Sequence, residues 1–251
     1  MESITRSLNA IWVVAKQEFE LFTVSPIVYF VSAVWLFFAG LFFAVSLVGF
    51  NTGFGEPSMN GVLNSMIFLM VFLAPAFTMR SLSDEIRSGT YELLITSPIR
   101  EWEVVVGKWV GVMGVFLFFV FIPMLIYPAI LLWRGNPDEA LMISGFISLF
   151  LTSGTMFAIG LLASSFTQYQ IVAYLISLVV GVFMLVADGV SSIVNSEFVV
   201  EVMRDVSLRD HYIALVNRSL VDPVDLAYFI GVIVIALFLA SQVLTTRRIS
   251  A

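Results

Sequence analysis

The chain has 251 residues, of which 60% are hydrophobic and only 12% are charged, and its formal net charge is −6. A soluble domain is about 25% charged, and one of this size could not bury so much apolar surface. The high apolar content excludes a disordered chain. The absence of cysteine and the negative charge also exclude a secreted disulfide scaffold and a nucleic-acid-binding protein. The composition therefore predicts a polytopic membrane protein.

Stretches without charge locate the membrane spans, because a charged side chain at the bilayer centre is costly and a span needs about 20 apolar residues. One such stretch, 140–187, is long enough for two helices, which the polar residues 164–170 divide. The sequence therefore predicts an all-α polytopic domain over residues 1–251. Its six expected spans are approximately 27–50, 60–78, 104–132, 140–163, 170–187 and 224–244.

The distribution of basic residues predicts the orientation. Six spans place both termini on the same side of the membrane, and eight of the twelve Lys and Arg residues flank that side. Because cytoplasmic loops carry the excess of Lys and Arg, both termini are expected to be cytoplasmic.

Residues 4–22 are expected to form an amphipathic helix in the cytoplasmic interface, ahead of the first span. Apolar residues recur there at helical spacing, while Arg6, Lys16, Glu18 and Glu20 fall elsewhere. The apolar series is Ile4, Leu8, Ile11, Trp12, Ala15, Phe19 and Phe22. A simpler interpretation is that this stretch is the polar lead-in to the first span.

The connection 79–103 between spans two and three is long for a simple turn. Its signals predict a helix, a break and a second helix before span three. Ser81 and Asp84 have the spacing of a capping box, and Gly89 is expected to stop the first helix. Thr90 would cap the second helix, and Pro98 marks the restart of the chain.

That connection carries an apolar edge and an acidic edge, which would suit a groove on a soluble partner. The apolar edge comprises Tyr91, Leu93, Leu94 and Ile95, and the acidic edge comprises Asp84, Glu85 and Glu92. The alternative, which the residues leave equally open, is a solvated hairpin without a partner.

Two further patterns concern packing. Gly107 and Gly111, with Gly114 next, form a small-residue face for close helix packing, while Pro75, Pro123 and Pro128 are expected to kink spans two and three. Residues 188–223 are expected to form short amphipathic external helices, with Asp222 capping span six.

The sequence carries no recognisable catalytic chemistry. There is no phosphate-binding loop of the ATPase type, and one histidine without cysteine makes no metal cluster. That histidine, His211, is expected to be an ordinary surface residue. Ser153 has no nearby membrane-embedded base, which argues against an intramembrane enzyme. The spans have no ionisable residue in their interiors, which argues against an ion-coupled pump, so an energy source must come from elsewhere.

Three segments carry a resemblance to a known family. They are APAFTMR at 74–80, DEIRSGTYELL at 84–94 and TSP at 96–98. These segments resemble the ABC-2 type permeases, the membrane subunits of a class of ATP-binding-cassette transporters. The likeness is closest to the short permeases associated with gliding motility and nitrous-oxide-reductase maturation. Ser25-Pro26 and the Lys16 to Glu18 stretch also fit, although Gln17 interrupts the family's basic–acidic pair.

The resemblance implies that a separate partner subunit hydrolyses ATP for this chain. Residues 4–22 would be the elbow helix, and about 81–97 would couple the chain to a separate nucleotide-binding ATPase that holds ATP and Mg²⁺. The implied coupling interface comprises Asp84, Glu85, Arg87, Gly89, Thr90, Tyr91, Glu92, Leu93, Leu94 and Pro98. The chain itself would bind no cofactor and no metal, would not be an enzyme, and would bind no nucleic acid.

The resemblance also implies an assembly in the lipid bilayer of the bacterial cytoplasmic (inner) membrane. A second copy or a related permease would complete the path, and 188–223 would roof it. Residues 51–59 are too short for an outer domain, so an accessory extracytoplasmic subunit would have to supply one.

The expected function is that of a permease subunit, and export is the expected direction. Candidate residues for the path are Ser153, Thr155, Ser164, Thr167 and Gln168, unless these polar groups only make hydrogen bonds between helices. The alternative function is a non-transporting anchor that transmits force for a cytoplasmic ATPase in a motility or assembly complex. The sequence does not identify the substrate.

Overall fold

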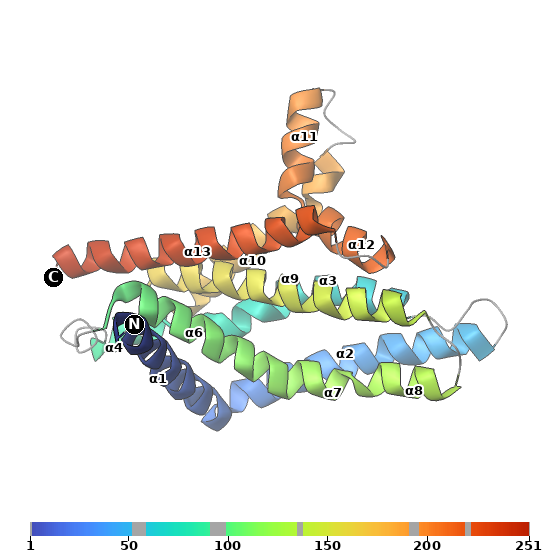
Figure 1. The fold of residues 1–251 in the computed structure, drawn as a ribbon, viewed down its shortest axis with the longest axis horizontal. Helices are drawn as coiled ribbons and strands as arrows, with labels where there is room; N and C mark the ends of the chain where they lie inside the picture. The colour runs from blue at the N-terminus through green and yellow to red at the C-terminus, as the bar shows by residue number, and fades with distance from the viewer. Residues whose placement is uncertain are drawn as a thin grey trace.

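The computed structural model describes residues 2–51, 59–90, 99–134, 138–190, 196–218 and 222–250. Within these ranges the chain is helical and has no strand (Figure 1). The elements are α1 (Glu2–Val24), α2 (Pro26–Asn51), α3 (Asn60–Thr78), α4 (Ser83–Ser88), α6 (Glu101–Phe116), the π-helix η1 (Leu117–Phe121), α7 (Ile122–Met124), α8 (Ile126–Arg134), α9 (Glu139–Phe166), α10 (Gln170–Val190), α11 (Glu197–Val206), α12 (Leu208–Arg218) and α13 (Pro223–Ser250).

The predicted fold class is confirmed, because six helical segments are long and apolar enough to cross a membrane. They run over Pro26–Val48, Gly61–Ser88, Glu101–Trp133, Glu139–Phe166, Gln170–Gly189 and Pro223–Arg247. Several extend past the predicted ends, since a helix can continue beyond its apolar core into the interface. The two chain ends and α4 lie at one end of the bundle (Figure 1).

Helix α9 is the centre of the bundle. Its most apolar window is 78% buried, against 28–56% in the other five spans, and it packs against α3, α10, α12 and α13. Phe157 of α9 makes edge-to-face contacts with Phe77 of α3 and Phe116 of α6. Lipid is as apolar as these side chains, so close packing of this kind, and not apolar burial alone, holds the helices together.

The predicted small-residue face of Gly107 and Gly111 is confirmed, and its partner is α1. A Cβ atom on Gly107 would lie 2.7 Å from the Cβ of Val14, and one on Gly111 would lie 2.7 Å from the Cβ of Glu18. Only glycine therefore lets the two backbones approach so closely. Helix α1 therefore packs closely along α6.

The predicted helix over 4–22 is present as α1. Leu8 and Trp12 of its apolar series are 60% and 66% exposed, whereas Glu18, which lies outside that series, is buried. The contact with α6 accounts for the buried Glu18, because the glycines of α6 allow close approach on the face of α1 that carries it. The placement of α1 in the membrane interface stays a prediction.

The third span is interrupted where prolines were expected to bend it. Helix α6 passes into the π-helix η1, and the chain then continues through Pro123 in α7 to a turn at Leu125 before α8 begins. Pro75, by contrast, lies inside α3, which continues to Thr78. The first half of span three is thus one uninterrupted α-helix, and its hydrogen-bonding pattern changes at Leu117.

The segment that was predicted to be external forms two short helices that differ in their contacts. Helix α12 buries Leu208, Tyr212 and Leu215 against the bundle, and the Tyr212 hydroxyl donates a hydrogen bond to the Leu63 carbonyl. Helix α11 stands away from the bundle and has no buried residue (Figure 1). The amphipathic helices predicted for 188–223 are therefore present at 197–206 and 208–218.

Candidate functional site

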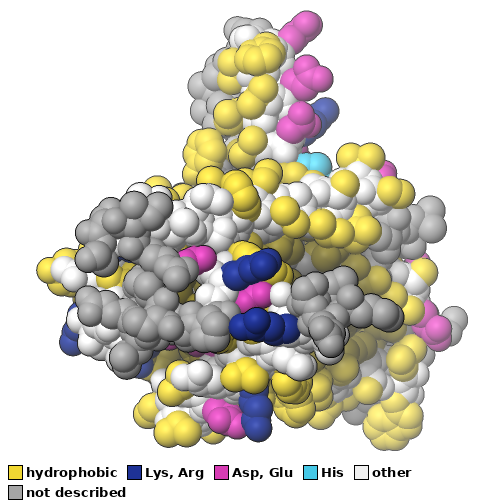
Figure 2. Space-filling model, turned by 60° about the vertical axis from the view of Figure 1, so that its left-hand side comes forward, with side chains coloured by type: hydrophobic (Ala, Val, Ile, Leu, Met, Phe, Trp, Pro, Cys, Tyr) yellow, Lys and Arg dark blue, Asp and Glu magenta, His cyan; other side chains and the backbone are white. Residues whose placement is uncertain are grey.

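A cavity of about 860 Å³ opens at the end of the bundle that carries α4 and both chain ends. Basic and acidic side chains gather on this end, between hydrophobic flanks (Figure 2). The cavity is lined by Val14, Gln17, Glu18, Leu21, Phe22, Ser25, Arg80, Ser81, Asp84, Glu85, Arg87, Ser88, Thr90, Val104, Lys108 and Gln170. It therefore brings α1, α4, α6 and α10 together at one site.

The start of α4 is held by a residue from another helix. The backbone N–H groups of Leu82 and Ser83 donate to the Ser164 hydroxyl of α9, at 3.2 and 2.9 Å, and that hydroxyl donates to the Met79 carbonyl at 3.2 Å. The predicted capping box of Ser81 and Asp84 is wrong. Helix α4 begins at Ser83, and the buried Ser81 hydroxyl has no hydrogen-bond partner among the described residues.

The end of α4 agrees with the prediction. Gly89 follows the last helical residue with a φ of 71°, in the left-handed region that side chains disfavour. Beside it the hydroxyls of Ser88 and Thr90 lie 2.8 Å apart. Arg87, Ser88, Gly89 and Thr90 are all exposed, so α4 ends in a polar tip at the surface.

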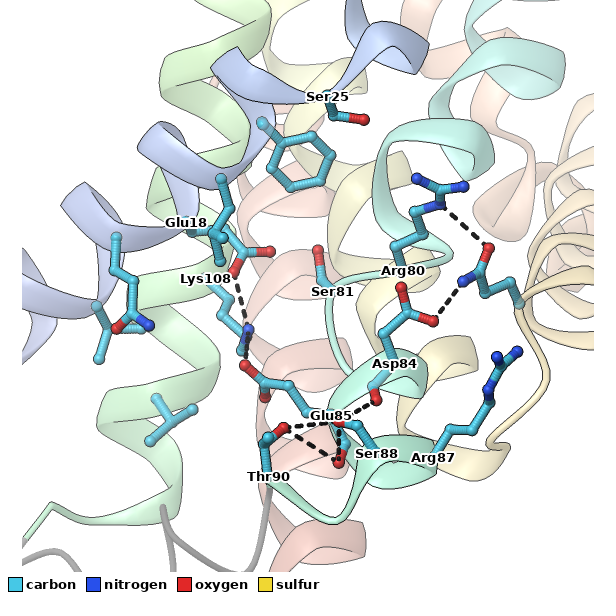
Figure 3. A pocket seen from close by; sticks show the side chains of 16 residues that line it. Glu18, Ser25, Arg80, Ser81, Asp84, Glu85, Arg87, Ser88, Thr90 and Lys108 are labelled. Atoms are coloured by element: carbon cyan, nitrogen blue, oxygen red, sulfur yellow. Dashed lines mark hydrogen bonds and ion pairs between the residues drawn. The ribbon is translucent and has the colours of Figure 1, made fainter.

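One side of α4 is tied to α10 through a chain of polar groups. The amide of Gln170 donates to the carboxylate of Asp84, and its oxygen accepts a hydrogen bond from the Arg80 guanidinium at 3.1 Å (Figure 3). These contacts set the rotation of α4. Asp84 is half-buried and faces Gln170, while Arg87 is exposed.

The other side of α4 is tied to α6 and α1 by a buried lysine. The ammonium of Lys108 lies 2.8 Å from a Glu18 oxygen and 2.8 Å from a Glu85 oxygen (Figure 3). The side chains of Lys108 and Glu18 are 4% and 5% exposed, and that of Glu85 is 22% exposed. We name these three residues the Lys108 cluster.

Half of the predicted coupling interface lies within the described residues. Asp84, Glu85, Arg87, Gly89 and Thr90 come together on or beside α4. The other five predicted residues lie outside the described ranges, namely Tyr91, Glu92, Leu93, Leu94 and Pro98. The second short helix that Thr90 was expected to cap lies there too.

The arrangement presents an exposed polar tip on a short helix that is held by contacts to α9, α10 and α6. Among the described residues, no three His, Asp or Glu side chains are placed to hold a metal ion. The model of one protein family, described as ABC-2 family transporter protein, matches residues 4–247.

The chain belongs to the ABC-2 family. No curated protein matches it. As an ABC-2 protein it is a multi-pass membrane permease of the ATP-binding-cassette class, whose permeases have no ATPase motif of their own and pair with an ATP-binding subunit. The finer likeness to gliding-motility and nitrous-oxide-reductase permeases stays a prediction.

The residues predicted to line a path through this ABC-2 permease fall into two groups. Ser153 and Thr155 are buried in α9 and donate to carbonyls of their own helix, at 2.6 and 3.0 Å, and Ser164 holds α4. Thr167 accepts a hydrogen bond from the Tyr169 N–H at 3.1 Å, and Gln168 is exposed. A path lined by these residues stays a prediction.

His211 is not the ordinary surface residue that the sequence suggested. Its side chain is 15% exposed, and its Nδ1 lies 2.7 Å from a carboxylate oxygen of the buried Asp225. The imidazole also stacks on Tyr228, with ring centroids 3.9 Å apart. The pair joins α12 to α13 at the end of the bundle opposite α4. Burial also raises the pKa of Tyr212 in α12.

Sequence reasoning did not predict that Glu18 and Lys108 form a buried ion pair or that Ser164 caps α4. One signal for the first two was present, because Val14, Glu18 and Phe22 share a helical face with four-residue spacing. Lys108 also stands directly beside Gly107, in the small-residue face that predicted a close helix neighbour. No comparable signal in the chain pointed to Ser164 as the cap of α4.

Proposed function

We propose that this permease forms a translocation path as a dimer, driven by a separate ATPase that binds the segment 81–97. The two permeases would be copies of this chain or related chains, and ATP and Mg²⁺ would be held by the ATPase. Export is the proposed direction. The proposed location is the bacterial cytoplasmic membrane, with both termini and α4 on the cytoplasmic side and, where needed, an accessory extracytoplasmic subunit outside.

The observation that carries this proposal is the anchored polar tip of α4. Its tip residues Arg87 to Thr90 are exposed, while its base is fixed by Ser164 and by the contact between Asp84 and Gln170. A partner that binds this tip would displace a helix whose base is hydrogen-bonded to α9 and α10. Exposed polar groups at the tip also favour a soluble partner over lipid.

In the proposed cycle, ATP closes the dimer of ATPase subunits and pushes on α4. The push tilts spans two and three, and the path at the dimer interface opens outward. Residues 99–100 lead directly into α6, so little chain separates the coupling segment from span three.

A second candidate is the non-transporting anchor. One observation favours it: the buried polar residues Ser153, Thr155 and Ser164 all have hydrogen-bond partners within the single chain. Because these hydroxyls already have hydrogen-bond partners, their burial is explained without a translocation path. Both candidates use the same coupling site, so only a transport measurement separates them.

The first test is purification of the tagged protein from native membranes in mild detergent. The expected result is a co-purifying ATPase at equal stoichiometry. Proline at Gly89 cannot adopt a positive φ, so Gly89→Pro is expected to lose the ATPase or its coupled hydrolysis, whereas Gly89→Asn, which tolerates that conformation, is expected to keep both.

A charge reversal provides a second, matched comparison. Glu92→Lys is expected to weaken ATPase binding, whereas Glu139→Lys, an exposed acid at the opposite end of the bundle, is not. A wild-type preparation that is free of ATPase, or Gly89→Pro and Glu92→Lys variants with normal binding and turnover, would refute the proposed coupling site.

A further inference from the structure

The Lys108 cluster is a buried charged group at which three helices meet. Glu18 comes from α1, Glu85 from α4 and Lys108 from α6, and both ion-pair distances are 2.8 Å (Figure 3). One oxygen of Glu85 is buried and has no hydrogen-bond partner among the described residues. The single ammonium therefore serves two carboxylates that belong to different helices.

Stability alone does not explain this cluster. Removing three charged groups from water is costly, and apolar side chains of similar volume are often as stable as a buried ion pair or more so. Helices α1 and α6 are already in close contact through Gly107 and Gly111. A charged group at this place is therefore best explained by the fixed geometry that it imposes on α4.

Helix α4 makes little apolar contact with its neighbours. It is six residues long, and its buried residue is Ser83, at the end that Ser164 holds. Its Glu85 carboxylate reaches away from that end to Lys108. The ion pair therefore provides α4 with a directional contact to α6, and through Lys108 to Glu18 of α1.

Helix α6, which carries Lys108, ends in a change of helix type. Helix α6 is regular from Glu101 to Phe116, and it is followed by the π-helix η1 and by the turn at Leu125. π-Helical turns and prolines are the places where long helices bend. A displacement of α6 would thus be absorbed between Leu117 and Leu125.

We propose that Lys108 is the positioning residue that transmits a displacement of α4 to α1 and to α6. This inference rests on the proposed function, because it assumes that an ATPase moves α4. The unit that moves consists of α1, α4 and residues 101–116, and it bends against the rest of span three at 117–125. Glu18 makes α1 part of the moving unit.

The test uses the complex of permease and co-purified ATPase in lipid nanodiscs. The chain has no cysteine, so Val13→Cys, at a position 60% exposed on α1, gives a single label site on the permease. Its labelling rate by a maleimide is compared without nucleotide and with ATP and vanadate. The expected nucleotide-dependent change is of the size usual for coupled sites, about 5- to 150-fold.

The matched pair of variants is Glu18→Gln and Glu20→Gln. Both remove one carboxylate from α1, but Glu18 is buried on Lys108, whereas Glu20 is exposed and lies 3.8 Å from Lys16. Glu20→Gln is expected to keep the nucleotide-dependent change in labelling. Glu18→Gln is expected to lose most of it while the ATPase still co-purifies and hydrolyses ATP.

A triple variant covers the case in which a lone buried charge prevents folding. Lys108→Met with Glu18→Met and Glu85→Gln removes all three charges of the cluster and leaves no buried carboxylate without its lysine, so this variant is expected to fold. If it still transmits the signal, or if it loses the ATPase, the inference is overturned, because the cluster would then be dispensable or would only shape the docking surface. Wild type without any ATPase would refute the proposed function instead.

Discussion

Gly111→Ala is expected to loosen α1 from α6. The added Cβ would lie 2.7 Å from the Cβ of Glu18 and 2.8 Å from the carbonyl oxygen of Ala15. Neither atom is the free end of a side chain, so the helices themselves must separate. Overpacking of this kind costs about 1–3 kcal/mol. Alanine also favours the helical state, but α6 is helical whether or not α1 is attached, so that gain cancels.

The assay is the labelling of a single cysteine at Val14, which is 7% exposed against α6. A free-energy change of ~1.4 kcal/mol alters an equilibrium constant tenfold, so a cost of about 1–3 kcal/mol should raise the population with α1 detached by roughly 5- to 150-fold. The labelling rate should rise by the same factor, because only the detached state exposes this cysteine.

The control is Gly231→Ala in α13, where a Cβ would meet no atom within 4 Å. This variant is expected to label at the wild-type rate. Equal labelling of Gly111→Ala and Gly231→Ala would refute the conclusion that the glycines of α6 hold α1.

Three further predictions concern other parts of the bundle. Ser164→Ala removes the acceptor for two buried amides and should lower stability by about 1–3 kcal/mol, measured as a lower melting temperature in detergent. His211→Leu leaves the carboxylate of Asp225 without its partner and should also lower the melting temperature, and a second change, Asp225→Leu, should recover part of the loss. Burial raises the pKa of Tyr212, so the folded state keeps this proton and stability should fall as pH rises above about 10; Tyr212→Phe should reduce that alkaline loss.

Each of these has a result that contradicts it. An unchanged melting temperature in Ser164→Ala would mean that α4 finds another cap. No recovery in the His211 and Asp225 double variant would mean that the two side chains act independently. An alkaline slope that is the same in Tyr212→Phe and wild type would assign the loss to other tyrosines.

The sequence was sufficient for the features that depend on one segment at a time. The six spans follow from apolar length, and the end of α4 follows from Gly89, whose backbone conformation only glycine adopts readily. Gly107 and Gly111 predicted that another helix packs closely against α6, but they did not identify α1 as that helix.

The contacts that shape the candidate site join distant parts of the chain. Ser164 holds an amide 81 residues away, and Lys108 pairs with Glu18 across 90 residues. Local spacing does not encode such pairs. The error over Ser81 has the same origin, since a local capping signal was outcompeted by a hydroxyl from the central helix.

The dependence of α4 on Ser164 has a consequence for engineering the protein. A six-residue helix cannot persist alone in water, and this one takes its cap from α9 and its lateral support from Lys108. A chimera that exchanges 81–97 between two permeases would therefore receive α4 without the two residues that hold it, Ser164 and Lys108. Grafting α4 into another permease requires the host to present a serine hydroxyl and an ammonium group at these two positions.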